Sequence, residues 1–290
     1  MQTFADSVLN ASWIMLVATG FALIYRCARF FHIAHGAVFT GAAYFMFSLT
    51  HWLALPVSVA APLAVVLGSL LGCEMEICVF RPLRRQHASS LVGLLASLGV
   101  YIVVQSTLST IFGDDTKTVR TAGVAEGLLL AGARITSVQI VTFLLSVVVV
   151  SSVAILLRTT RIGMLIRAVA NDPELSVVHG VENDRTILLA FALGSALASL
   201  AGILVALDVD MTPSMGLNPI LLAVVAVIIG GADSTVGIAL ASLLIGVARH
   251  GAVLCLGSEW QDATSFTLLL VVLLVRPRGL LGRPRQAVGA

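Results

Sequence analysis

Long apolar segments separated by short polar stretches constrain the fold of this chain more than any other feature. A helix needs about 20 mainly apolar residues to cross roughly 30 Å of hydrocarbon. Segments of this kind recur from one end of the sequence to the other, and no stretch is left over for a separate soluble domain. We expect spans at about 8–24, 36–54, 58–80, 91–112, 138–157, 186–207, 218–230, 238–256 and 263–275.

The composition agrees with a membrane chain and narrows its class. Hydrophobic residues make up 58% of the 290 positions and charged residues 11%, against about 25% charged in soluble domains. The apolar runs lack the period-two alternation of barrel strands, and only helices and closed barrels satisfy every backbone group in lipid. The sequence therefore predicts an all-α polytopic membrane bundle of about 8–10 transmembrane helices, some short or broken. We expect one domain over residues 1–290.

The basic residues are distributed unevenly between the two sides of this topology. With the N-terminus outside, thirteen of the 17 Lys and Arg residues fall in inward segments. The positive-inside rule favours that orientation, with the C-terminus in the cytoplasm. The outward segments hold Lys117, Arg120, Arg134 and Arg249, and the inward ones hold Arg26, Arg29, Arg81, Arg84, Arg85, Arg158, Arg161, Arg167, Arg185, Arg276, Arg278, Arg283 and Arg285.

Two places in the sequence favour interrupted helices. The seventh apolar run would be only about 20 Å long as a helix, and Gly230 and Gly231 end it. It is either a half-helix beside a substrate path or a full span extended by its neighbours. His32, His35 and Gly36 lie where the chain enters the second span, so they are candidates for a transport pathway or for a structural helix break.

The largest inward loop contains a short polar helix with clear end signals. Asp172 is a good N-cap, Pro173 suits the first helical position, Glu174 complements the positive helix end, and Gly180 is a natural terminator. A helix of about two turns is not stable alone and must pack against something. The apolar face that includes Leu175 either lies in a groove of a cytoplasmic partner or packs back on the membrane helices.

Six blocks in register resemble the branched-chain amino acid permease family, the membrane subunits of ABC importers that work with a separate binding protein. The resemblance spans nearly the whole chain, although no single block is decisive. The blocks are "FALIYRCARFFHIAHGAVFTGAAY" (21–44, with an Ala-His-Gly signature), "VFRPLRR" (79–85), "GMLIRAVANDPELSVVHGV" (163–181), "FALGSALASLAGIL" (191–204), "GGADSTVGIALASLLIG" (230–246) and "RPRGLLG" (276–282).

This resemblance implies a subunit of a larger importer in a bacterial inner membrane. The implied partners are a second, related permease subunit, two cytoplasmic ATP-binding subunits, a periplasmic substrate-binding protein and membrane lipid. No cofactor is expected, and because a G-x-x-x-x-G-K-[ST] loop is absent, nucleotide binding is left to the partners. The residues that match the family's ATPase-coupling loop are Arg167, Ala168, Asp172, Pro173, Glu174, Leu175 and Gly180.

The chain also departs from the family pattern. His32 stands where the family usually has Asn, Ala37 where an acidic residue is frequent, and Val236 where a proline is usual. If His32 and Ala37 line the path, substrate preference differs from that of typical members. A permease for urea or short-chain amides shares the same blocks and stays open as an alternative.

Other functional classes are less compatible with the residues. An ion-coupled secondary transporter or channel usually has ionisable residues at mid-membrane, whereas the acidic residues here cluster at span ends. We expect Glu74 and Glu76, about one turn before Arg81, to reach toward the interface. A membrane enzyme would need a motif such as H-E-x-x-H or G-x-S-x-G, and neither occurs. The net charge of +2 gives no reason to expect nucleic acid.

Overall fold

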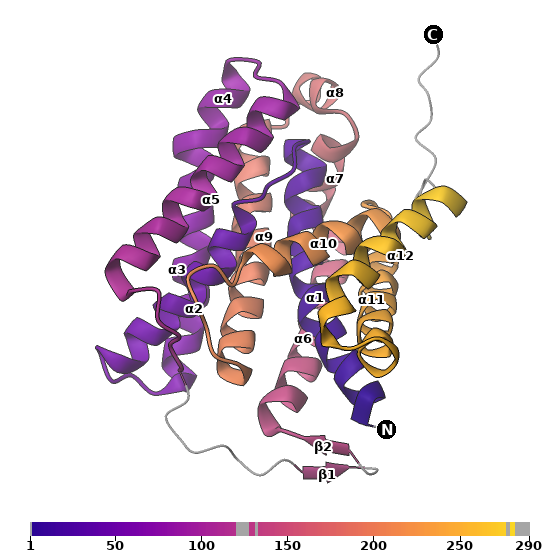
Figure 1. Ribbon diagram of the computed structural model, residues 1–290. Coiled ribbons are helices and arrows are strands. Elements are labelled where there is room, and N and C mark those ends of the chain that lie inside the picture. The colour runs from indigo at the N-terminus through magenta and orange to yellow at the C-terminus, as the bar shows by residue number, and fades with distance from the viewer. Residues whose placement is uncertain (1, 120–127, 131–132, 277–278, 282–290) are drawn as a thin grey trace.

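The computed structural model describes residues 2–119, 128–130, 133–276 and 279–281, and it is almost entirely helical (Figure 1). Arg120, Arg278, Arg283 and Arg285, which entered the count of basic residues, lie outside the described residues. The helices are α1 (Gln2–Ala28), α2 (His35–His51), α3 (Val57–Met75), a π-helical turn η1 (Glu76–Phe80), α4 (Arg81–Arg85), α5 (Ser90–Phe112), α6 (Ser137–Thr159), α7 (Arg161–Asn171), α8 (Pro173–Val178), α9 (Asn183–Asp208), α10 (Leu217–Gly230), α11 (Thr235–Cys255), a 3-10 turn η2 (Ser258–Trp260) and α12 (Gln261–Val275).

Each of the nine predicted apolar segments forms a helix, which confirms the all-α polytopic fold. Within the described residues, seven helical stretches are long and apolar enough to cross a membrane. Helices α2, with 17 residues, and α10, with 14, are shorter. A small antiparallel hairpin of β1 (Leu128–Leu130) and β2 (Ala133–Ile135) lies between α5 and α6, with Leu128 opposite Ile135.

Helices α1 and α9 form the centre of the bundle (Figure 1). Helix α1 packs against α6, α9, α10 and α11, and α9 also packs against α2 and α3. Helix α2 is buried along most of its length. By contrast, α5 and α12 carry many exposed apolar side chains, such as Leu95 and Leu274, as expected of surfaces that face lipid.

Small residues allow the central helices to approach closely: Gly194, Ala198 and Gly202 recur four positions apart along α9, a small-x-x-x-small pattern. A Cβ atom built at Gly194 would lie 2.7 Å from the carbonyl oxygen of Gly20 on α1. A Cβ at Gly202 would collide with the backbone of Phe39 on α2, and one at Gly72 on α3 would collide with the Ser195 side chain of α9. Close packing without side chains between the backbones is a common source of helix association in lipid.

Replacing Gly202 by Ala is therefore expected to destabilise the bundle by about 1–3 kcal/mol, the usual cost of overpacking a filled interior. Gly99 on α5 is the matched control, because a Cβ there meets nothing within 4 Å. Gly99→Ala should leave stability unchanged or raise it by up to about 1 kcal/mol through helix propensity. Unfolding of both variants in detergent, followed by circular dichroism, measures the difference. Equal stability of the two variants would contradict this account of the packing.

Candidate functional site

The polar loop between α6 and α9 folds into two short helices with complete N-caps. The Thr160 hydroxyl accepts a hydrogen bond from Gly163 N and starts α7. The Asp172 carboxylate accepts from Glu174 N and Leu175 N, both at 3.0 Å, and starts α8. Gly180 has φ +80°, a conformation that glycine adopts without strain. The predicted cap, first-turn proline and terminator of the helix at 172–180 all lie in these positions.

Helix α8 presents its apolar side chains to the outside of the chain. Leu175 is 54% exposed and Val178 is 80% exposed. The opposite face is covered by the body of the protein, because Ser176 is buried. The Asn183 side-chain amide, at the start of α9, donates to Pro173 O at 2.8 Å. Helix α8 therefore forms a stiff apolar projection anchored to α9.

Helix α7, which precedes it, is amphipathic and lies on the bundle. Its buried face consists of Gly163, Ile166 and Val169, which face α1, α6 and α9. Arg167 is exposed on the other face, and Ala168 is half-buried. The residues that match the family's coupling loop thus lie on or directly beside two adjoining short helices at one end of the bundle (Figure 1), and Arg167, Glu174 and Leu175 are exposed.

Arg29 connects this loop to the break between α1 and α2. Its backbone has φ 59°, in the left-handed region that L residues rarely adopt. Its guanidinium Nη2 donates to the carbonyl oxygens of Ala170 at 3.3 Å and Asn171 at 2.9 Å, at the end of α7. The sequence indicated only that Arg29 is one of the inward basic residues, because contacts between residues that are 141 and 142 positions apart leave no local signal.

The break itself places His32, His35 and Gly36 inside the bundle. After α1 ends, the chain turns back so that the His35 ring lies beside Gly20, eight residues before the end of α1. His32 and His35 are fully buried. His32 packs among Phe30, Phe80 and Phe191, with ring centroids 5.0–6.0 Å apart. These positions form a helix break in a closed aromatic environment, whereas a role in the transport pathway stays a prediction.

Helix α10 begins beside this break. A Cβ atom at Gly36 would lie 2.5 Å from the carbonyl oxygen of Gly216, which directly precedes α10. Helix α5 binds both the segment before α2 and the segment before α10. The Ser97 hydroxyl accepts a hydrogen bond from Ala34 N at 2.8 Å, and the Tyr101 hydroxyl, four residues later, donates to Ser214 O at 3.4 Å. Helix α10 has 14 residues, which gives a length of about 21 Å at 1.5 Å per residue. It is therefore too short to span a hydrocarbon core of about 30 Å by itself.

The other end of α10 is closed by glycines and by distant segments. Gly231 has φ +88° and ends the helix, while Gly230 packs against the backbone of Gly237 on α11. The Ile229 and Gly230 carbonyl oxygens accept hydrogen bonds from Leu280 N and Leu281 N. The Arg26 guanidinium, on α1, donates to the carbonyl oxygen of Ala232 in the same turn.

An ion-pair cluster next to α8 was not foreseen from the sequence. Asp184, in the first turn of α9, lies 2.8 Å from Arg81, 3.0 Å from Arg84 and 3.0 Å from Arg85. Arg84 also contacts Glu76 at 2.6 Å. Glu74 is exposed as expected, but the expectation that Glu76 reaches toward the interface is wrong, since it is 1% exposed. The π-helical turn that starts at Glu76 and the Arg84 guanidinium together hold this carboxylate inside.

Comparison with known proteins decides which family this arrangement represents. Residues 3–273 match the family described as "Branched-chain amino acid transport system / permease component". The chain belongs to this family. The resemblance to this family is thereby confirmed, although the block at 276–282 lies beyond the matched residues, and the chain is a multi-pass membrane protein whose relatives are transport permease components.

Several known permeases align with most or nearly all of the chain. The high-affinity branched-chain amino acid permease LivH of Salmonella typhimurium is 29% identical, over 98% of this chain and 96% of its own length. BraD of Pseudomonas aeruginosa is 28% identical over the same shares. The fructose import permease FruF of Bifidobacterium longum is 24% identical, over 90% of this chain and 72% of its own length.

A solved structure agrees with the fold of this permease. The Streptococcus pneumoniae PsaBC complex with Fab contains a chain that aligns with a TM-score of 0.55, covering 99% of this chain and 94% of its own. Because the two are 10% identical, the likeness concerns the helical architecture alone.

The ion-pair cluster leads to a stability prediction. Arg84→Met leaves the buried Glu76 carboxylate without its cation, which costs about 3–5 kcal/mol for a fully buried pair. We expect a smaller loss here because Arg84 is 29% exposed. Arg185→Met is the control, since the Arg185–Glu182 pair is 78% and 62% exposed and exposed pairs contribute less than about 1 kcal/mol.

Thermal unfolding in detergent measures both losses, and adding Glu76→Gln to Arg84→Met should recover part of the stability. An Arg84 variant no less stable than the Arg185 variant would refute the assigned role of the pair.

Proposed function

We propose that the chain is one permease domain of an ABC importer that moves branched-chain amino acids across a bacterial inner membrane. ATP hydrolysis by two cytoplasmic ATP-binding subunits drives the transport, a second, related permease subunit completes the membrane part, and a periplasmic binding protein delivers the substrate. The N-terminus lies outside and the C-terminus in the cytoplasm. The family match and the branched-chain amino acid transport functions of LivH and BraD support this proposal.

The observation that carries the mechanism is the exposed apolar face of α8. A capped helix with Leu175, Val177 and Val178 more than half exposed has the shape of a segment that inserts into a groove of another protein. The positive-inside rule favours the cytoplasm for this end of the bundle. We therefore assign α7 and α8 as the contact with the ATP-binding subunits.

Two connections would carry a displacement of α8 into the membrane. The first is the Asn183–Pro173 hydrogen bond, which joins α8 to the start of α9. The second is Arg29, which joins the end of α7 to the break before α2. When the ATP-binding subunits close, a push on α8 thus reaches both α9 and the His32–Gly36 break. Stiff capping serves this purpose, because a frayed helix would absorb the push.

The first test concerns the contact itself. Leu175→Asp combined with Val178→Asp should abolish co-purification of the ATP-binding subunits and ATP-driven leucine uptake, because charged groups replace the apolar contact. Leu256→Asp is the control: Leu256 is 62% exposed and follows the end of α11, away from α8 (Figure 1). Retained ATPase in the double variant would exclude α8 as the contact. Leucine uptake by reconstituted wild-type chain without any ATP-binding subunit would favour a secondary transporter or channel instead.

The second test distinguishes binding of the ATP-binding subunits from transmission of their movement into the membrane helices. Arg29→Gln should keep the ATP-binding subunits bound but lower ATP-driven uptake about tenfold, a typical size for a coupling between sites. Arg158→Gln, which removes an exposed charge from the end of α6, should leave uptake unchanged. The measurement is the ratio of leucine transported to ATP hydrolysed in proteoliposomes. If the Arg29 variant keeps a wild-type ratio, the link through α7 plays no part in transport.

A further inference from the structure

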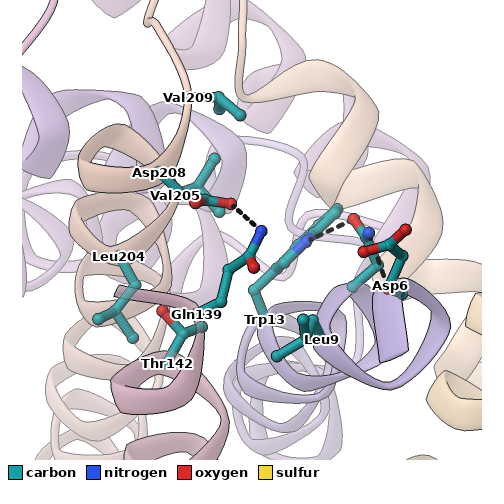
Figure 2. Close-up of a pocket in the computed structure, with 10 residues that line it drawn as sticks. Asp6, Leu9, Trp13, Gln139, Thr142, Leu204, Val205, Asp208 and Val209 are labelled. Atoms are coloured by element: carbon teal, nitrogen blue, oxygen red, sulfur yellow. Dashed lines mark hydrogen bonds between the residues drawn. The ribbon is translucent and has the colours of Figure 1, made fainter. Parts of the chain in front are cut away.

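A cavity of about 160 Å³ lies at the end of the bundle where α1 and α6 begin and α9 ends (Figure 2). A cavity needs only about 10–15 Å³ of such space to hold one water molecule, so this one has room for a small organic molecule. Leu9, Leu204 and Val205 give it an apolar wall. The loop residues assigned to ATPase coupling do not contribute to it.

The charged residues that line the cavity are all acidic. Asp6 and Asp208 line it, and none of its lining residues is basic. Asp208 is the last residue of α9, where the negative end of the helix dipole disfavours a carboxylate. Its hydrogen bond from Gln139 Nε2 is long, at 3.5 Å, and it forms no ion pair with any residue that the structure describes. Within the part of the chain that the structure describes, this half-buried carboxylate thus has no compensating cation.

Hydrogen bonds hold the remaining polar side chains of the lining in place. The Asn10 amide donates to Asp6 O at 3.0 Å and accepts from Trp13 Nε1 at 3.1 Å. Gln139 forms a capping box with Thr136 at the start of α6. In Figure 2 the Trp13 side chain lies between Asp208 and Asp6. An indole beside carboxylates is a favourable environment for an organic cation.

We propose that this cavity binds the ammonium group of a small aliphatic amine or amino acid, with Asp208 and Asp6 as its anionic partners. The hydrocarbon body of the ligand lies against Leu204 and Val205, and the carboxylate of an amino acid stays toward the open side. Its identity as the transported amino acid rests on the proposed function. A site of this kind selects amino acids over urea and neutral amides, which carry no ammonium charge.

Trp13 provides the signal that tests the site. The full chain is purified with Trp52→Phe and Trp260→Phe, which leaves Trp13 as the only one of the three tryptophans. Its fluorescence is followed during titration with four compounds that share an isobutyl group. We expect saturable changes with isoamylamine and L-leucine, and none with neutral isovaleramide or anionic isovalerate. Equal responses to isoamylamine and isovaleramide would overturn the proposal.

Charge variants identify the anionic partner. Asp208→Asn should weaken isoamylamine binding about tenfold or more, as expected when a charged hydrogen-bond acceptor is lost, and Asp208→Glu should keep binding within a few-fold of wild type. Glu259→Gln is the control, because Glu259 is exposed and does not line the cavity. Unchanged affinity in Asp208→Asn, with Asp208→Glu folded and binding normally, would overturn the assignment.

Leucine uptake by the assembled transporter separates this proposal from the proposed function. Ammonium binding that depends on Asp208 in a system without ATP-driven leucine uptake would support the site and refute the transport function. Uptake that is normal in a chain whose Trp13 reports no ammonium binding would refute the site alone.

Discussion

Every backbone polar group inside a membrane must find a partner within the protein, and this constraint is hardest to meet where a helix starts or ends inside the bundle. Helices α2 and α10 both start there. Their first turns are closed by local hydrogen bonds such as Gly36 N to Ile33 O and Leu217 N to Ser214 O. Ser97 and Tyr101, one turn apart on α5, bind the two segments that precede these helices. The position of α5 and the close approach at Gly36 follow from this requirement.

The contacts that would transmit a conformational change lie around the end of α1. Three residues near the end of α1 hold two other segments: Arg26 binds the turn after α10, whereas Cys27 and Arg29 contact the Ile166 and Asn171 carbonyl oxygens of α7. On the far side, Asp184 joins α9 to the arginines of α4. A movement of α7 or α8 relative to α1 must therefore break polar contacts or carry these elements along.

The parts of the structure that local chemistry determines could be predicted from the sequence. Apolar length located all nine main helices, and the cap and terminator residues located α8, because Asp172 and Gly180 act on neighbours two to four positions away. The depth of the break could not be predicted, since it depends on contacts of His35 with Gly20. Nor could the burial of Glu76, which depends on Arg84 and a π-helical turn. The ammonium cavity joins residues of α1, α6 and α9, and this combination has no motif.

The closing of α10 by Leu280 and Leu281 also bears on the order in which the chain is assembled. The carbonyl oxygens of Ile229 and Gly230 find these amide partners only after α11 and α12. During synthesis, the carbonyl oxygens at the C-terminal end of α10 thus lack these partners until both later helices have been inserted. Membrane insertion of the short helix and the final closing of the turn at Gly230 and Gly231 are separate events, and the second awaits residues 279–281.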